Sequence, residues 1–284
     1  MGRVIGFLIA LDLLLFALFD LLPDAASVQL GLYGADSSLL TTARERMGLT
    51  GPWYWRVFEH WGNVARLDFG RSAAGNYEIA QLLRARLEVS VPLWVGGFSL
   101  LILIPIPLSM VYCSRTIGPL RRALLHAAHL ANMPQFLAAV ILFAIAQALS
   151  AGVLPQSSAL RWGLAVLSSA LLPMGILFTI SANSFRSAAQ ERYCDMYLAL
   201  GMSWNLIRVI LLRNVLLSMR AVAGRLMLGL LLGSVFAEMT FGYTGFGAVF
   251  VEALRSGDIN VMRAWVLISG AVVLVATAIE SGSL

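Results

Sequence analysis

Lysine is absent from this sequence, and all 20 basic side chains among its 284 residues are arginine. Charged residues of both signs make up only 12% of the chain, whereas soluble globular domains contain about 25%. Hydrophobic residues reach 59%, and the mean hydropathy is +0.82. This composition excludes an ordinary water-soluble fold.

The sequence also lacks the short motifs that carry chemistry in many enzymes. It contains no GxxxxGK phosphate loop, no HExxH, no CxxC and no GxSxG elbow. His60, His126 and His129 do not form a catalytic set with an acid and a nucleophile. His126 and His129 share a helix face, but contact with water explains them better than metal binding. We therefore expect no catalytic residue, no metal site and no cofactor in this chain.

Long apolar runs dominate what is present. Six runs of near-spanning length lie at 4–22, 89–113, 123–150, 163–182, 216–239 and 261–279. A helix needs about 20 residues to cross a hydrocarbon layer of about 30 Å. A transmembrane barrel would show short alternating segments instead of continuous runs. The sequence thus predicts an all-α polytopic membrane protein with six transmembrane helices.

The distribution of arginine predicts the orientation of these helices. The loop 114–122 has three Arg and no acid, whereas the segment 23–88 has seven Arg and seven acids. Short loops rich in cations stay in the cytoplasm. We expect both termini and the loops 114–122 and 183–215 inside, and 23–88 outside. The pI near 9.7 is therefore a signal of topology first, and we expect no nucleic-acid partner.

Three regions follow from this topology. Residues 1–22 form the first transmembrane helix, since the run is longer than the apolar core of a cleaved signal peptide and has no clear cleavage site. Residues 23–88 form the external segment, and 89–284 form a core of five transmembrane helices. Neither Cys113 nor Cys194 falls in an oxidising compartment, so both are expected to be free thiols.

The external segments contain amphipathic patterns. We predict a short helix ending before Gly48 and a second helix after Pro52, which brings several aromatic rings together. Such rings favour the headgroup zone of a membrane, and contact with a soluble partner is the alternative. After the fifth apolar run, the stretch 238–261 is too polar to span and predicts a surface or half-inserted helix on the external side.

Some ionisable residues fall in or near the apolar runs. Ionised groups inside a bilayer cost several kcal/mol unless they face a partner or water, so they mark a pathway or a helix pair. Asp20 and Glu238 lie near the outer ends and can reach water. Asp12 and Arg225 are more informative, and either a pore or a structural ion pair explains them. Asp12, Arg225 and Glu238 are the candidates for the pore or gate.

The stretch 193–214, "YCDMYLALGMSWNLIRVILLRN", is mixed in character between two apolar runs. Its apolar positions follow one helical stripe: Tyr193, Tyr197, Leu200, Trp204, Ile207 and Leu211. Gly201 interrupts the stripe and allows two short helices to meet at an angle. From the pattern alone, the segment is either a lever for a soluble partner or a helix packed on its own bundle.

The spacing Asp195-x3-Ala199-x-Gly201 resembles the EAA loop of ABC transporter permeases, Glu-Ala-Ala-x3-Gly. Asp195 stands at the Glu position and Gly201 at the Gly, while Met196 and Tyr197 replace the two alanines. The resemblance continues in "LLRNVLLS", similar to the Arg-Asn-x-Leu-x-Pro end of the dipeptide, oligopeptide and nickel permeases. In this sequence Ser218 replaces that proline.

Further matches follow in order along the chain: "LLP" at 21–23, "MGLTGPW" at 47–53, "LDFGRS" at 67–72, "MPQF" at 133–136, "GVLP" at 152–155 and "EMTFGYTGFG" at 238–247. In the last of these, Thr244 stands where the family has proline. The chain thus resembles the first of the two permease subunits in peptide/nickel-type ABC importers of bacterial inner membranes.

The resemblance implies a type I importer permease fold, with the loop 183–215 as the coupling loop. It implies a heterodimer with a second permease, two cytoplasmic ATPase subunits that use ATP and Mg, an extracytoplasmic solute-binding protein and membrane lipid around the chain. The coupling residues it implies are Asp195, Tyr197, Ala199, Gly201, Trp204 and Arg208. Tyr197 and Trp204 would anchor the ATPase contact, and Asp195 and Arg208 would tune its rim.

The substrate stays open between peptides, which the sequence favours, and nickel or a metallophore. Two other classes of protein are weaker alternatives. A membrane enzyme would need polar groups that converge at one depth, and the sequence shows none. An ion-coupled secondary transporter, with Asp12 carrying the proton, should show inverted repeats, and no clear internal similarity is visible.

Overall fold

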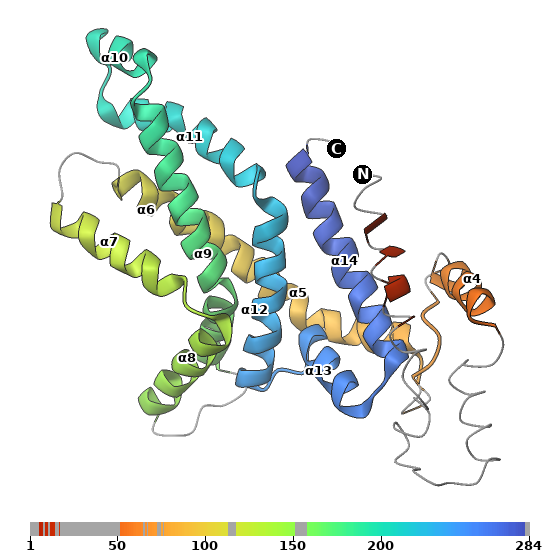
Figure 1. Ribbon diagram of the computed structural model, residues 1–284. Coiled ribbons are helices and arrows are strands. Elements are labelled where there is room, and N and C mark those ends of the chain that lie inside the picture. Colours follow the sequence, from red (N-terminus) through yellow and green to blue (C-terminus); the bar gives the residue numbers. More distant parts are fainter. Residues whose placement is uncertain are drawn as a thin grey trace. The chain divides into compact units, whose positions relative to one another are not determined.

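The structure is a computed structural model (Figure 1). It describes residues 52–64, 66, 68–72, 75, 77–112, 118–150 and 158–281, together with 6, 7, 9, 10, 12–14 and 17. The expected helix before Gly48 lies outside these residues, as do Asp20 and Cys113.

Helices make up nearly all of the described chain. They are α4 (Trp53–Val64), α5 (Ile79–Leu103), α6 (Pro105–Tyr112), α7 (Gly118–Ala131), α8 (Gln135–Leu149), α9 (Ala159–Ala189), α10 (Arg192–Ala199), α11 (Trp204–Arg220), α12 (Ala223–Phe241), α13 (Phe246–Ser256) and α14 (Ile259–Ser281). Arg71 and Glu78 make an isolated antiparallel bridge, and the described residues contain no longer strand. The all-α prediction is confirmed, including the helix after Pro52 and the helix within 238–261.

Four described helices are long and apolar enough to cross a membrane: Ile79–Tyr112, Ala159–Ala189, Ala223–Phe241 and Ile259–Glu280. The first joins α5 to α6 through a turn at Ile104 and begins ten residues before the expected position 89. Pro105, which lacks an N–H, starts α6 at this turn. The expected run 4–22 lies mostly outside the described residues.

The prediction of one continuous span over 123–150 is wrong. The chain forms α7 and then α8, and the break falls at Pro134. Pro134 has an extended ψ of 133° and precedes α8, while Leu137 and Ala138 donate their N–H groups to its carbonyl. Because proline cannot donate into a continuing ladder, it begins the new helix instead of extending the old one.

The start of the expected span 216–239 is also wrong. Residues up to Arg220 belong to α11, a turn follows at 221–222, and α12 begins at Ala223. Arg220 donates from Nε to the carbonyl of Ile279 at 2.8 Å. A Cβ added at Gly224 would lie only 2.4 Å from Cγ2 of Thr277. Contacts with the end of α14 therefore accompany the bend, and the local apolar pattern contained no sign of it.

The chain divides into two compact units, one of residues Met1–Ser90 with Thr244–Leu274 and the other of Val91–Tyr243 with Val275–Leu284. In the second unit, α9 packs against α6, α8, α11 and α12. A buried cluster at its centre contains Leu101, Ala170, Leu177, Leu226 and Leu230. Large aliphatic side chains thus fill most of the centre of this unit.

Gln135 lies at a close junction of three helices in this unit. Its buried amide donates to the carbonyl of Gly229 at 2.7 Å and to that of Ser169 at 3.4 Å, which links α8 to α12 and α9. A Cβ added at Gly233 would lie 2.4 Å from the carbonyl oxygen of Ser169. The "MPQF" motif thus combines a helix break with a polar clamp between three helices.

In the first unit, polar groups hold the turn between α13 and α14. The hydroxyl of Ser72 donates to the buried carboxylate of Asp258, which also accepts from the N–H of Val261 at 3.3 Å. The N–H of Phe246 donates to Ser90 Oγ at 2.7 Å. These bonds attach α5 and the segment before it to the two ends of α13.

Candidate functional site

The stretch 193–214 folds as two short helices at one end of α9 (Figure 1). Gly201 lies between them with φ +79°, a left-handed conformation that glycine adopts without strain. Its N–H donates to the carbonyl of Leu198 at 3.0 Å, and that of Met202 donates to Tyr197 at 3.1 Å. Ser203 then caps α11 by accepting from the N–H of Leu206 at 3.4 Å. Gly201 therefore separates two helices, as the sequence predicts.

Most of the apolar stripe faces the protein's own bundle. Ile207 and Leu211 are fully buried in a cluster with Phe185, Cys194, Ile106, Ala188 and Val215. Tyr193, Tyr197 and Trp204 are half-buried and pack against this cluster. Leu200 departs from the stripe, since 71% of its surface is exposed. The two aromatic residues that we expected to anchor a partner therefore pack internally.

The outward face of the segment consists of other residues. Asp195, Met196, Leu198, Ala199, Leu200 and Gly201 are all exposed. This face combines one carboxylate with large apolar side chains on a short helix and its turn. Such a face has the composition of a surface that becomes buried in a partner pocket.

Arg208 is tied to the bundle. Its Nη1 donates to the carbonyl of Met110 on α6 at 3.2 Å, and its Nη2 donates to Oδ1 of Asn205. A guanidinium held by two such acceptors links α11 to α6. Arg208 thus contacts α6 from α11, and its expected role at the rim of the ATPase contact stays a prediction.

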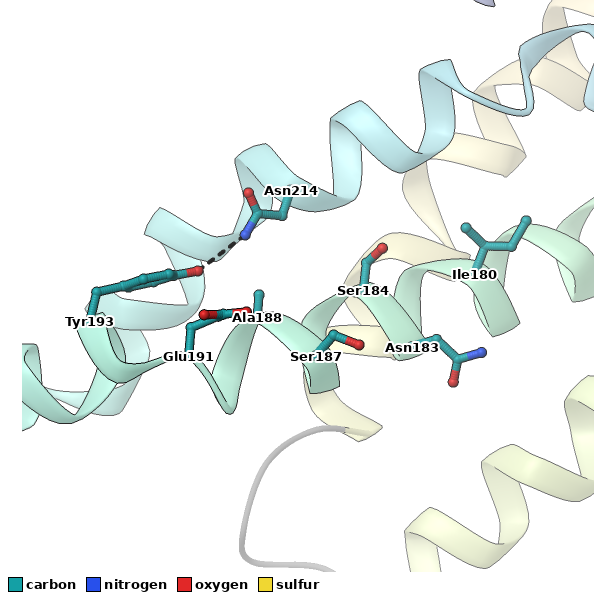
Figure 2. A pocket seen from close by; sticks show the side chains of 8 residues that line it. All are labelled: Ile180, Asn183, Ser184, Ser187, Ala188, Glu191, Tyr193 and Asn214. Atoms are coloured by element: carbon teal, nitrogen blue, oxygen red, sulfur yellow. Dashed lines mark hydrogen bonds between the residues drawn. The ribbon is translucent and has the colours of Figure 1, made fainter.

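An open groove of about 640 Å³ lies between the end of α9 and the α10–α11 pair (Figure 2). Most of its lining residues have polar side chains: Ile180, Asn183, Ser184, Ser187, Ala188, Glu191, Tyr193 and Asn214. Nδ2 of Asn214 donates to the hydroxyl of Tyr193 at 3.3 Å across its end. The hydroxyls of Ser184 and Ser218 hydrogen-bond each other, so Ser218 joins α11 to α9.

Cys194 is a buried free thiol in α10. Its Sγ donates to the carbonyl of Ala188 at 3.2 Å. Burial raises the pKa of the Cys194 thiol above its ordinary value, and the carboxylates of Asp195 and Glu191 raise it further. Cys194 is therefore a small core residue with little nucleophilic character.

The three candidates for the pore or gate have different surroundings. Asp12 is buried, and its Oδ2 lies 3.4 Å from Nη2 of Arg263 and 3.5 Å from Nε2 of His60. Arg225 is exposed on α12. Glu238 is fully buried, so the expectation that it reaches water is wrong. The cation that pairs with Asp12 is Arg263.

Sequence reasoning missed Arg263, Asn214 and Gln135 as individual contacts. Arg263 had a visible signal, because it is an arginine inside the run 261–279 and such residues need a partner. Asn214 and Gln135 had no such signal beyond their place in motifs. Among the described residues, no three His, Cys, Asp or Glu side chains come together as metal ligands would.

Residues 118–281 match the family described as "Binding-protein-dependent transport system inner membrane component". Among curated proteins, the chain is 24% identical over 268 residues to "Glutathione transport system permease protein GsiC" of Shigella boydii serotype 4 (strain Sb227), with 92% of this chain and 87% of that protein covered. It is 25% identical over 323 residues to "Di/tripeptide transport system permease protein DppB" of Pseudomonas aeruginosa (strain UCBPP-PA14), with 96% and 91% covered.

The GsiC protein of Escherichia coli (strain K12) is 23% identical over 268 residues, at the same coverage as its Shigella relative. The match to the family covers more than half of the chain, and it includes α9, α10, α11 and α12 but not α6. The protein is a multi-pass membrane permease of type I fold. It belongs to the family of binding-protein-dependent inner membrane transport components and is the permease subunit of an ABC importer.

Proposed function

We propose that this chain forms half of a translocation pore for peptides. It pairs with a second, different permease and with two cytoplasmic ATPase subunits, and an extracytoplasmic solute-binding protein delivers the ligand. ATP and Mg bind to the ATPase subunits. The named substrates of the relatives, glutathione and di- or tripeptides, support peptides over nickel or a metallophore.

The observation that carries this proposal is the two-faced α10–turn–α11 segment. One face is exposed and partly apolar, and the opposite face packs into a buried cluster with α6 and α9. A partner that presses on the exposed face therefore moves a joined set of helices. ATP-driven closure of the ATPase pair would be transmitted by rigid movement of helix groups.

The contacts of this segment indicate how movement of the ATPase subunits is transmitted to the pore. The Arg208 bond to the Met110 carbonyl ties α11 to α6, and the Ser184–Ser218 bond ties α11 to α9. Beyond Arg220 the chain turns directly into α12, a candidate span. Movement of α10 and α11 is therefore coupled to α6, α9 and α12 together.

These positions divide the coupling residues into two groups. Asp195, Ala199 and Gly201 lie on the exposed face and contact the ATPase subunit. Tyr197, Trp204 and Arg208 face the bundle and transmit the movement. Leu200, the most exposed large side chain of the turn, inserts into the ATPase pocket in the place that we expected Trp204 to occupy.

Two matched variants test this division. Leu200→Ala should leave the thermal stability of the complex unchanged and weaken the stimulation of ATP hydrolysis by loaded binding protein. Trp204→Ala should lower the midpoint of thermal unfolding, because it removes a ring that packs on a buried cluster. If Leu200→Ala has the stimulation curve of the wild type, the assignment of this face to the ATPase contact fails.

The orientation places 23–88 outside and both termini, with 183–215, inside. Two serine-to-cysteine changes test it, each at an exposed position: Ser256→Cys at the end of α13 and Ser187→Cys near the end of α9. In a background without Cys113 and Cys194, an impermeant thiol reagent should label only Ser256→Cys in intact cells. Labelling of both positions from outside would contradict the orientation.

Reconstitution tests the function itself. The purified permease alone should not hydrolyse ATP, whereas the assembled complex should, at a rate that rises with loaded binding protein because docking favours the closed ATPase pair. In proteoliposomes, a labelled tripeptide should accumulate only with ATP. Uptake of nickel without competition from peptides would support the alternative substrate. Uptake driven by a proton gradient without ATP would support a secondary transporter.

A further inference from the structure

Helix α4 has two different faces. On one face Tyr54, Trp55 and Phe58 have 55%, 66% and 77% of their surfaces exposed. His60, on the opposite side, and Trp61, next to Tyr54 at the edge of the exposed face, are half-buried, and their rings meet edge to face at 6.3 Å between centroids. Three exposed aromatic side chains on one face of a twelve-residue helix require an apolar or amphipathic surrounding.

The buried face of α4 fixes its level along α14. Nε2 of His60 lies 3.5 Å from Oδ2 of Asp12, and Nη2 of Arg263 lies 3.4 Å from the same oxygen. Asp12 and Arg263 are both buried. The carboxylate of Asp12 is thus shared between Arg263 of α14 and the ring of His60 on α4. Movement of α4 along α14 would therefore separate His60 from Asp12.

Arg263 lies four residues beyond Ile259, where α14 begins. At 1.5 Å per residue, this is about 6 Å along the helix axis. The candidate span Ile259–Glu280 is about as long as a hydrocarbon layer is thick, so its first turns lie at a membrane boundary. The Asp12–His60–Arg263 cluster therefore holds α4 at the level where hydrocarbon gives way to headgroups.

We propose that α4 is an interfacial helix whose Tyr54, Trp55 and Phe58 side chains insert into the lipid headgroup zone of the outer leaflet. The assignment to the outer leaflet rests on the proposed orientation, whereas the contact with lipid does not. Tyrosine and tryptophan favour this zone because the ring is half buried there while its polar edge stays wet.

The length and composition of α4 agree with this placement. Its 12 residues extend about 18 Å, which is too short to cross a hydrocarbon layer of about 30 Å, so the helix lies along the membrane. An amphipathic helix with aromatic residues on one face binds in the plane of the interface. A soluble partner would need this face above the headgroups, and the cluster with Arg263 holds it lower.

Spin-label depth measurement tests the contact with lipid. A nitroxide is attached at Phe58→Cys in the assembled complex, with Cys113→Ser and Cys194→Ala, in phosphatidylcholine nanodiscs. Ser256→Cys, at an exposed position at the end of α13, serves as the control. Collision with oxygen should exceed collision with water-soluble chromium oxalate at position 58 severalfold, and the ratio should reverse at 256.

The same label tests the cluster and the rival partner. His60→Ala should raise the access of chromium oxalate to position 58 severalfold, and His60→Gln, which keeps a polar group, should raise it less. Equal access at positions 58 and 256 would overturn the contact with lipid. If chromium oxalate loses access to position 58 only when saturating binding protein is added, the aromatic face of α4 contacts that protein instead of lipid. An unchanged depth in His60→Ala would overturn the role of the cluster.

These outcomes are separate from the proposed function. Depth is measured without transport, so a complex that fails to carry peptides can still show lipid contact at position 58. Labelling with an impermeant reagent determines the leaflet independently. A wrong orientation would move the helix to the inner leaflet and leave its contact with lipid in place.

Discussion

Asn214 on α11 donates a hydrogen bond from Nδ2 to the hydroxyl of Tyr193 on α10, over 3.3 Å (Figure 2). The two residues are 21 positions apart and close the hairpin that Gly201 opens. Asn214 belongs to the Arg-Asn element and Tyr193 lies two residues before Asp195, where the EAA-like spacing begins, so this bond joins the regions of two of the motifs that carry the family resemblance. A contact between them keeps α10 and α11 moving as one piece.

Tyr193→Phe should weaken this hairpin while keeping the ring. The bond contributes about 1 kcal/mol, and its loss leaves the Asn214 amide without this acceptor. The ring contact with Tyr197, at 6.0 Å between centroids, is retained. We expect faster amide hydrogen exchange across α10 and weaker stimulation of ATP hydrolysis. Tyr197→Phe is the matched control, and equal exchange in both variants would show that the bond does not stiffen the hairpin.

Substitutions at Gly201 should rank by their tolerance of its φ of +79°. A Cβ there meets nothing within 4 Å, so the backbone angle alone decides the cost. Asn adopts this conformation readily, Ala costs about 1 kcal/mol, and Pro cannot adopt it at all. Pro also removes the N–H that bonds to Leu198. We expect near-normal transport for Gly201→Asn, reduced transport for Ala, and an inserted but inactive protein for Pro.

Normal ligand uptake by Gly201→Pro would falsify the assignment of this turn to coupling. Insertion is checked by the amount of protein in purified membranes. Binding of the ligand by the soluble binding protein should be the same for all three variants, since Gly201 belongs to the permease.

Gly233→Ala should disrupt the packing of α12 on α9. The new methyl group would lie 2.4 Å from the backbone oxygen of Ser169, which cannot move as a side chain can. Overpacking of this kind costs about 2 kcal/mol. Gly163→Ala, in α9, is the control because a Cβ there meets nothing within 4 Å. Thermal unfolding in detergent should show a lower midpoint only for Gly233→Ala, and equal midpoints would contradict the close approach.

Cys194 should react slowly with thiol reagents at pH 8, because burial and two nearby carboxylates raise its pKa. The ordinary cysteine pKa is about 8.5, so its thiolate fraction is smaller than in an unfolded chain. The folded state then holds this proton more tightly. The contribution of the Cys194 thiol to the free energy of unfolding is therefore complete below the ordinary cysteine pKa. It is lost as the pH rises through the higher pKa of the folded state. A labelling rate equal to that of the denatured protein at pH 8 would contradict the burial of Cys194.

The sequence alone determined the class of protein and much of its organisation. Runs of apolar residues at spanning length require helices, because a backbone in lipid must satisfy its hydrogen bonds within the segment. Gly201 predicted the turn between α10 and α11, because few other residues adopt a positive φ. The ordered motifs from 21–23 to 238–247 indicated the permease family, and the match over 118–281 shows it.

Only the tertiary structure decided which side of each element faces inward. The stripe 193–211 is compatible with packing on a partner or on the bundle, and a local pattern cannot choose between two apolar surroundings. Contacts with α14 accompany the bend at 221–222, and Arg263 proved to be the partner of Asp12 across 251 residues of sequence. Such pairings depend on which helices lie together, and periodicity within one helix carries no information about its neighbours.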